Sequence, residues 1–155
     1  MKRNEIYQAV RDFLSLFETA SESVESNQEN LRLALDRFAL ASNFVDLEFD
    51  ETDYPDAPRK DYNELRALVS KFFPNYDFYN VVTNLSVNVG LPSDAVGDAI
   101  DDIVDIASDL YEVEWLWKNT SEDNALWHFS FGYNSHWGEH LRWLQLYILA
   151  EKNGQ

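Results

Sequence analysis

The sequence predicts an all-α fold, a single-domain bundle of about five helices with one long ordered loop and little or no β structure. Apolar residues recur at three- and four-residue steps over several stretches, which is typical of helices that bury one face. Polar or proline-containing breaks separate these stretches. The one β-like stretch, residues 78–89, has no second convincing strand to pair with, so we expect an extended connector there. A chain of 155 residues is long enough for one domain with a proper core.

Residues 1–47 are predicted to form a hairpin of two helices. The first helix begins near Glu5, and its apolar face consists of Ile6, Val10, Phe13, Leu14 and Phe17. The polar residues 21–28 are expected to turn the chain, with Asn27 or Asn30 as the cap of the second helix. The apolar face of the second helix consists of Leu31, Leu35, Phe38, Ala41 or Ser42, and Val45.

Residues 48–60 are predicted to form an ordered loop that crosses the surface. Two prolines disfavour helix in this segment, and the aromatic residues Phe49 and Tyr54 are expected to hold it in place.

A helix over residues 61–73 follows, with Asp61 as its cap and Glu64 at the reciprocal position of a capping box. Pro74 ends this helix, and residues 74–92 are expected to be the connector.

An acidic central helix is predicted for residues 93–119, with Ser93 as its cap. Its apolar face consists of Val96, Ile100, Ile103, Ala107, Leu110 and Trp117. A second face, which we call the acidic ladder, consists of Asp98, Asp102, Asp105, Asp109 and Glu112. Because no Lys or Arg occurs between Lys71 and Lys118, compensation for this charge must come from elsewhere in the fold or from a partner.

Residues 121–152 are predicted to form the C-terminal helix, capped by Ser121 or Thr120. Between residues 126 and 133 aromatic residues alternate with small or polar ones, which is the spacing of a strand. The capped start and the later apolar stripe favour helix on both sides, so a helix with a kink between Gly132 and Gly138 is expected. That stripe consists of Trp137, Leu141, Leu144 and Ile148.

Composition limits the setting in which the protein works. The formal net charge of −16 repels nucleic acid and anionic membranes, and it attracts basic proteins and cations. The chain has no cysteine, which excludes disulfides and thiolate metal sites. Its N-terminus lacks the apolar core of a signal peptide, and no apolar run reaches membrane-spanning length. We therefore expect a cytoplasmic protein that binds neither nucleic acid nor membrane, of undetermined oligomeric state.

The segment from His136 to His140 is the sharpest motif for chemistry. Two histidines four residues apart on a helix point the same way and can hold one zinc ion, and this H-x-x-E-H order places Glu139 to activate a water. The third ligand would have to come from the acidic ladder, for example Asp105 or Asp109, because only Glu151 remains downstream. In the alternative interpretation, the histidines donate hydrogen bonds to these same carboxylates where two helices cross, with Gly138 allowing the close approach.

The acidic ladder itself offers ligands for magnesium. Carboxylate pairs on helices hold this ion in small all-α nucleotide pyrophosphohydrolases, and the chain has a suitable size. Phosphate binding normally needs Lys or Arg within reach, and only Lys71, Lys118 or Arg142 could fold back onto this helix. The alternative is a solvated acidic face. The candidate ligands for zinc or magnesium are His136, His140, Asp98, Asp102, Asp105 and Asp109.

The remaining histidine and the tryptophans favour structural roles. His128 lies among aromatic residues, where a hydrogen-bonded core or rim histidine is expected rather than a ligand. The five tryptophans are assigned mostly to the core by their spacing, although an exposed pair would suggest a partner anchor or an aromatic-lined pocket.

Several segments in order resemble an uncharacterised bacterial family, domain of unknown function family 5063. The resemblance runs from about Asp53 to Ala150, and it rests on the segments Tyr54-Pro55-Asp56-Ala57-Pro58-Arg59-Lys60-Asp61-Tyr62, Tyr79-Asn80-Val81-Val82, Val96-Gly97-Asp98-Ala99-Ile100-Asp101-Asp102, Leu126-Trp127-His128-Phe129 and Ser135-His136-Trp137-Gly138. It implies a bacterial, stand-alone domain with no established activity, and it offers no functional residues.

These features rank three hypotheses, none of which the sequence decides. The first is a non-enzymatic acidic module of an immunity or adaptor type, which binds a basic protein through Asp101, Asp102, Asp105, Asp109 and Glu112. It is favoured because no complete catalytic set is present and no cofactor is required. The second is a metal-dependent hydrolase of phosphate or nucleotide substrates, in which the acidic ladder and the two histidines share one cleft. The third is a bundle that binds a small molecule in its aromatic cluster.

Overall fold

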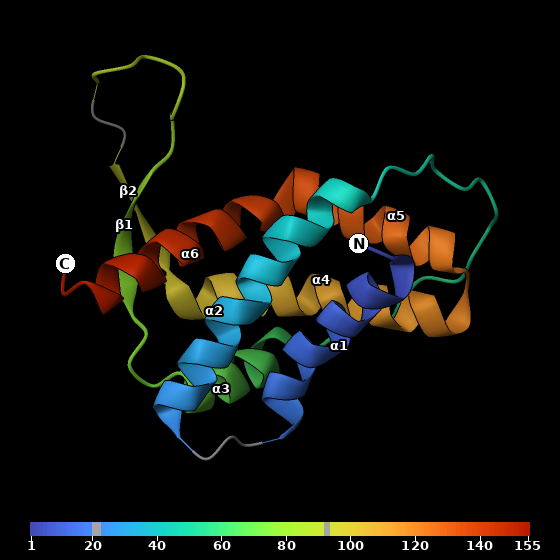
Figure 1. Ribbon diagram of the computed structural model, residues 1–155, viewed down its shortest axis with the longest axis horizontal. Helices are drawn as coiled ribbons and strands as arrows, with labels where there is room; N and C mark the ends of the chain where they lie inside the picture. The colour runs from blue at the N-terminus through green and yellow to red at the C-terminus, as the bar shows by residue number, and fades with distance from the viewer. Residues whose placement is uncertain (20–22, 92–93) are drawn as a thin grey trace.

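The computed structural model describes residues 1–19, 23–91 and 94–155, which are mostly helical as predicted (Figure 1). In these residues the elements are α1 (Arg3–Glu18), α2 (Val24–Ala41), the short 3-10 helix η1 (Ser42–Phe44), α3 (Tyr62–Phe72), β1 (Phe78–Val82), β2 (Asp94–Asp98), α4 (Ala99–Asn119), α5 (Glu122–Gly132), the π-helical turn η2 (Tyr133–Trp137) and α6 (Gly138–Lys152). Because α5, η2 and α6 follow one another without a break, they form one long bent helix.

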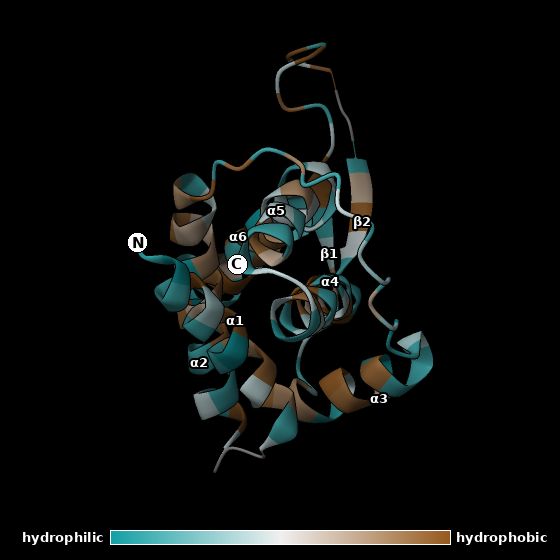
Figure 2. Cartoon of the chain, turned by 90° about the vertical axis from the view of Figure 1, so that its right-hand side faces the viewer, coloured by the Kyte–Doolittle hydropathy of each residue, from teal (hydrophilic) through white to brown (hydrophobic). Residues whose placement is uncertain are grey.

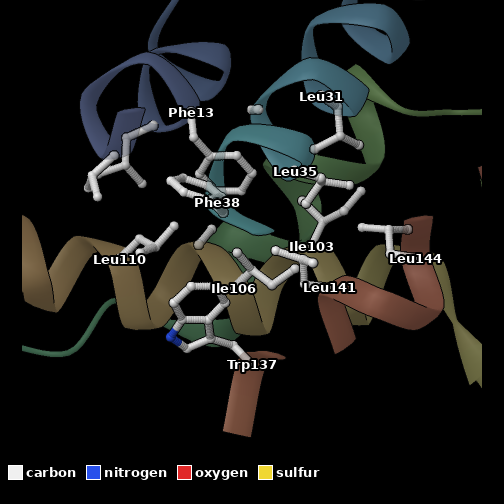
Figure 3. Close-up of a cluster of buried hydrophobic side chains, with 14 of the residues drawn as sticks. Phe13, Leu31, Leu35, Phe38, Ile103, Ile106, Leu110, Trp137, Leu141 and Leu144 are labelled. Carbon is white, nitrogen blue, oxygen red and sulfur yellow. The ribbon is translucent and has the colours of Figure 1, made fainter. Parts of the chain in front are cut away.

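Helix α4 is the centre of the bundle, and α1, α3, α5 and α6 all pack against it (Figure 1). Most residues predicted for the apolar faces of the helices meet in one core, in which Phe13, Phe38 and Leu110 are fully buried. Val96 does not, because it lies on β2 and is 71% exposed. Figure 3 shows Trp137 reaching into the same core beside Ile106 of α4. This packing fixes the face of α4 that is turned toward α6.

The second helix begins earlier than its sequence indicated. Ser23 is the N-cap of α2 and accepts a hydrogen bond from the Ser26 amide at 3.1 Å, so the prediction of a cap at Asn27 or Asn30 is wrong. The polar stretch predicted as a turn is helical from Val24 onward, because a serine cap compensates for its low helix propensity. Residues 20–22 of that stretch lie outside the described residues. Asn27 is buried and donates to the Phe72 carbonyl, which ties α2 to the end of α3.

The predicted connector contains a strand, which corrects the expectation of an unpaired segment. β1 pairs with β2 in an antiparallel hairpin whose register places Tyr79 opposite Gly97. The partner strand was missed because its residues were assigned to the first turn of the acidic helix. That helix instead begins at Ala99, where the Asp98 side chain accepts hydrogen bonds from the amides of the first turn. The cap predicted at Ser93 lies outside the described residues.

The hairpin and its connecting loop project from the bundle (Figure 1). Figure 2 shows apolar segments in this projecting loop, and its exposed large side chains include Val82, Leu85, Val87, Val89 and Leu91. Measured over the described residues, no helix has the length and apolarity needed to cross a membrane.

The two remaining caps and the predicted bend are found where the sequence placed them. Asp61 accepts from the Glu64 amide, and Ser121 accepts from the Asn124 amide. The reciprocal side-chain bond predicted for Glu64 is not found within the described residues. The ambiguous residues 126–133 are helical, and the bend between Gly132 and Gly138 is the π-helical turn η2. In η2 the Gly138 amide donates to the Tyr133 carbonyl, one residue farther back than in an α-helix.

Candidate metal centre

The acidic ladder keeps to one flank of the molecule, but its first member acts in the fold. Asp98 caps α4, and its other carboxylate oxygen accepts from Arg66 Nη2 at 2.6 Å. The adjacent Asp101 accepts from the Tyr62 hydroxyl and lies 3.6 Å from Arg66 Nη1. Asp98 and Asp101 therefore have a cation from α3, and Asp98 is not available as the metal ligand that the sequence suggested.

Asp102 is the most deeply buried acid of the ladder, at 3% exposure. It accepts one hydrogen bond from the Tyr79 hydroxyl and one from His140 Nδ1 at 2.7 Å. Tyr79 reaches Asp102 from strand β1. Its ring lies against Gly97 of β2, where a Cβ would be only 2.6 Å from the ring, so a side chain at this position would collide with Tyr79. The hairpin therefore positions the Asp102 carboxylate, which in turn positions His140. Local sequence patterns did not indicate this role of the hairpin.

Asp109 holds the other histidine of the motif. It lies 3.0 Å from His136 Nδ1, two turns nearer the C-terminus of α4 than Asp102. A Cβ at Gly132 would lie 2.7 Å from Trp137 Nε1 and 3.3 Å from Asp109 Oδ2, so this glycine makes room first for the Trp137 indole and also lets Asp109 approach closely. Gly138, which the sequence suggested for that role, instead leaves room for the Tyr133 carbonyl of η2, only 2.2 Å from where its Cβ would be.

Asp105 lies between the two histidines and completes a cluster. Its Oδ2 is 3.6 Å from His140 Nε2. One ring nitrogen of His136, one of His140 and one oxygen of Asp105 all lie within 4.8 Å of one another. Since Nδ1 of each histidine faces a carboxylate, Nε2 is the nitrogen left to face Asp105. The sequence identified these three residues only as candidate ligands. The packing of α6 on α4 brings their ligand atoms close together.

The surrounding charges favour a cation at this cluster. The hydrogen bond to Asp102 raises the pKa of His140, against the lowering by burial, and Asp105 and Asp101 add to the rise. Burial raises the pKa of Asp105, and repulsion by Asp101 adds to it, while His140 and His136 oppose it. A half-buried carboxylate beside other carboxylates is thus electrostatically unfavourable as an anion, which a bound cation would relieve.

The C-terminal part of α4 is compensated by arginine and lysine. Glu112 lies 3.7 Å from Arg59 Nε, and the buried Glu114 accepts from Arg11 Nη1 at 2.6 Å and from Lys118. Compensation therefore does come from distant parts of the chain.

None of the three cations that the sequence suggested for the ladder pairs with it within the described residues, and Lys71 is exposed there without a hydrogen bond or ion pair. Arg142 donates to Tyr133 and Gln145, and Lys118 binds Glu114. The arginines that reach the ladder, Arg59 and Arg66, come from the loop and from α3, and their long sequence separation from α4 hid them.

Three further expectations differ from the structure. Glu139 is exposed and makes no hydrogen bond or ion pair in the described part of the chain, so the geometry does not place it to activate a water beside the histidines. Trp137 is the one fully buried tryptophan in that part, while the other four are half-buried. His128 lies at the rim, as expected, and its ring is edge-on to that of Trp127, but it has no hydrogen bond in the described residues.

A cavity of about 200 Å³ opens beside the cluster. Its lining includes His136, Asp109, Glu112 and His128, from α4, α5 and η2. Solvent and a small ligand can therefore reach the edge of the cluster from this side.

The overall arrangement resembles a solved structure. The crystal structure of protein BF1032 from Bacteroides fragilis matches with a TM-score of 0.74 at 16% identity, over 94% of this chain and 89% of that chain. This likeness concerns the fold alone. No match was found among curated proteins. The model of the family described as Domain of unknown function (DUF5063) matches residues 3–145, and the chain therefore belongs to this family.

Proposed function

We propose that this protein binds one divalent transition metal ion through His136, His140 and Asp105. The observation that carries the proposal is the convergence of three ligand atoms within 4.8 Å, taken from α4, η2 and α6. Two imidazoles and a carboxylate suit zinc and related ions better than magnesium, which prefers oxygen ligands.

The carboxylates behind the histidines support the same proposal. Metal-bound histidines usually donate their second ring N–H to a carboxylate or carbonyl, which fixes the tautomer and the ring orientation. Asp102 and Asp109 stand in this position behind His140 and His136 at 2.7 and 3.0 Å. Each Nε2 is thereby left with its lone pair for a metal.

The cluster needs little adjustment to close around an ion. Ligand atoms in a tetrahedral zinc site lie about 3.3 Å apart, given metal–ligand distances of about 2.0–2.2 Å. His136 is the exposed member, with a side chain 47% accessible, so it is free to supply the movement.

Three protein ligands leave one position for water, which is the arrangement of catalytic rather than structural zinc sites. An ion there would lower the pKa of the bound water and support hydrolysis. The acids around the cluster oppose phosphate substrates, since the arginines that reach the ladder, Arg59 and Arg66, are paired with Glu112, Asp98 and Asp101. We therefore favour a hydrolase of uncharged or cationic substrates over the phosphate chemistry considered from the sequence.

Zinc titration by calorimetry tests the proposal, with the protein first stripped by a chelator. We expect one saturable site, weakened by about 100-fold or more in His136→Ala, in His140→Ala and in Asp105→Asn. The third histidine offers a matched control, because His128→Ala removes an imidazole outside the cluster and should leave the affinity within about twofold. Absence of a 1:1 site, or an equal loss in His128→Ala, would refute the metal site.

The acidic interaction module remains a second hypothesis, supported by the net charge of −16. The support for its predicted partner face is reduced, because four of its acids already have partners within the chain: Asp101, Asp102, Asp109 and Glu112. A basic partner recovered from lysate at low salt and released at high salt would support it. If charge reversal at Asp101 and Glu112 left such binding unchanged, the face would be excluded.

A further inference from the structure

A second and larger cavity, of about 490 Å³, lies under the loop between α2 and α3. Its floor is formed by Glu112 and Leu116 of α4 with Asn124 and His128 of α5, and its wall by residues of the loop from Phe49 to Arg59. The volume is in the range of small-molecule sites. It shares Glu112 and His128 with the cavity beside His136, so the two cavities adjoin.

Charged groups in this lining are nearly all anionic. Asp53 and Asp56 are exposed at the rim and make no hydrogen bond or ion pair within the described ranges. Glu112 is half-buried at the floor, where burial raises its pKa and Asp109 and Asp56 raise it further, while Arg59 opposes the rise. One arginine lines the cavity, Arg59, and it is 89% exposed and 3.7 Å from Glu112, a loose pair that a ligand can displace.

A buried amide in the floor offers a further acceptor, independent of these acids. Asn124 is 4% exposed, and its Nδ2 donates to Thr120 Oγ1 at 3.0 Å. The single hydroxyl proton of Thr120 is already donated to the Leu116 carbonyl at 2.7 Å, so this oxygen can only accept from the amide. The orientation of Asn124 is thereby fixed, and its Oδ1 is left without a hydrogen bond in the described part of the chain.

His128 adds to the cavity floor an imidazole that has no hydrogen bond in the described residues. Burial lowers its pKa, which keeps the ring neutral near pH 7 and able to accept from a donor. Apolar surface is provided by Phe49, whose ring packs edge-on against Trp127 at 4.8 Å, and by Leu116. The cavity thus combines hydrogen-bond acceptors and negative charge with an apolar wall.

From this lining we infer that the cavity binds a small organic cation, an alkyl ammonium or alkyl guanidinium, whose N–H groups reach Glu112 and Asn124. An anionic ligand would have to be desolvated against at least three carboxylates with one exposed arginine in return. Binding itself does not depend on the metal. Only the further point, that the bound cation would lie next to the metal and be its substrate, rests on the proposed function.

Calorimetric titration of the full chain with agmatine, which carries both cationic groups, tests the inference in the presence of a chelator. We expect saturable binding that is weakened by about tenfold or more in Glu112→Gln and in Asp56→Asn. The matched control is Glu51→Gln, the same loss of charge on the same loop but outside the lining, which should change the affinity by less than about twofold.

Several outcomes would overturn the inference. One is the absence of saturable agmatine binding up to about 10 mM, a limit that corresponds to a very weak site. Another is an equal loss in Glu51→Gln and Glu112→Gln, which would show only general attraction to an acidic surface. Preferential binding of inorganic phosphate would also contradict it. Because the chelator is present throughout, failure here leaves the zinc titration intact, and failure of the zinc titration leaves agmatine binding intact.

Discussion

Helix α4 carries two kinds of carboxylate, distinguished by the base that faces them. Asp98, the N-cap, and Glu114 face Arg66 and Arg11, while between them Asp102 in the first turn and Asp109 near the middle of the helix face histidines. An arginine keeps its proton at any ordinary pH and has no lone pair to offer, so these pairs can only hold elements together. A histidine that donates one ring N–H still has a second nitrogen, and the part of α4 from Asp102 to Asp109 is therefore the part equipped for ligand chemistry.

Among the variants that test this difference between the two kinds of carboxylate, Gly138→Ala is expected to have the largest effect. A Cβ there would lie 2.2 Å from the Tyr133 carbonyl, so the π-helical turn that carries His136 would have to rearrange. We expect a loss of about 3 kcal/mol or more in the free energy of unfolding, together with loss of zinc binding. Urea denaturation and calorimetry measure the two effects. Ser135→Ala, an exposed change in the same turn, should cost less than about 0.5 kcal/mol, and an equal cost for both would contradict the account.

The arginine pairs are expected to differ in stability contribution according to their burial. Arg11→Ala should cost about 2 kcal/mol, because Glu114 is only 9% exposed and would keep Lys118 alone. Arg66→Ala should cost about 1 kcal/mol or less, because Asp98 retains two backbone donors. Urea denaturation monitored by circular dichroism gives both values. Zinc affinity should be unchanged in both variants. A loss above about tenfold in either would contradict the view that the arginine pairs only stabilise the fold and the histidine pairs hold the metal.

Two conservative substitutions compare the kinds of carboxylate directly. Asp102→Asn would present either an amide donor or a weaker acceptor to His140 Nδ1. An amide donor there favours the tautomer with the proton on Nε2, the nitrogen assigned to the metal. We expect zinc affinity to fall by about 10- to 100-fold. Asp98→Asn keeps an oxygen for the helix cap and should leave the affinity within about twofold. Equal affinities in the two variants would show that Asp102 does not orient a ligand.

The smallest expected effect is a pH dependence of stability in the metal-free protein. The pKa of His140 is raised in the fold, chiefly by Asp102, so its contribution is fully present below the unfolded value near 6.5 and is lost as pH rises through the folded pKa. His140→Gln should therefore destabilise more at about pH 5.5 than at about pH 8.5. His128 has a pKa lowered by burial, so it costs stability as pH falls, and His128→Gln should show the opposite trend. Melting curves with the same sign of trend for both would contradict these assignments.

Local patterns predicted the helices because each helix carries its own information. The apolar stripes of α1, α2 and α4 needed only spacing, and the caps at Asp61 and Ser121 needed only adjacent residues. The bend at η2 followed from two glycines in an otherwise helical stretch. The meeting of the histidines with the ladder was also predictable, since both lie on apolar-striped helices that must pack.

The contacts that distinguish the two kinds of carboxylate were not predictable in this way. Arg59, Arg66 and Tyr79 reach α4 from separate elements, and their partners are set by how the chain folds back. The strand pairing was hidden because Asp94–Asp98 has the composition of an acidic helix start, and because β1 and β2 are joined by a long loop rather than a tight turn. Asn124 of the cavity floor is oriented by its side-chain hydrogen bond to Thr120, which no periodicity records.

X-ray absorption at the zinc edge, on protein loaded with one equivalent of zinc, tests the central claim most directly. The account predicts two imidazole nitrogens and one or two oxygens at about 2.0–2.2 Å, and loss of the imidazole signal in the double variant His136→Ala/His140→Ala. A shell of oxygens alone, or an imidazole signal that persists in the double variant, would show that the cluster of Asp105, His136 and His140 is no metal site.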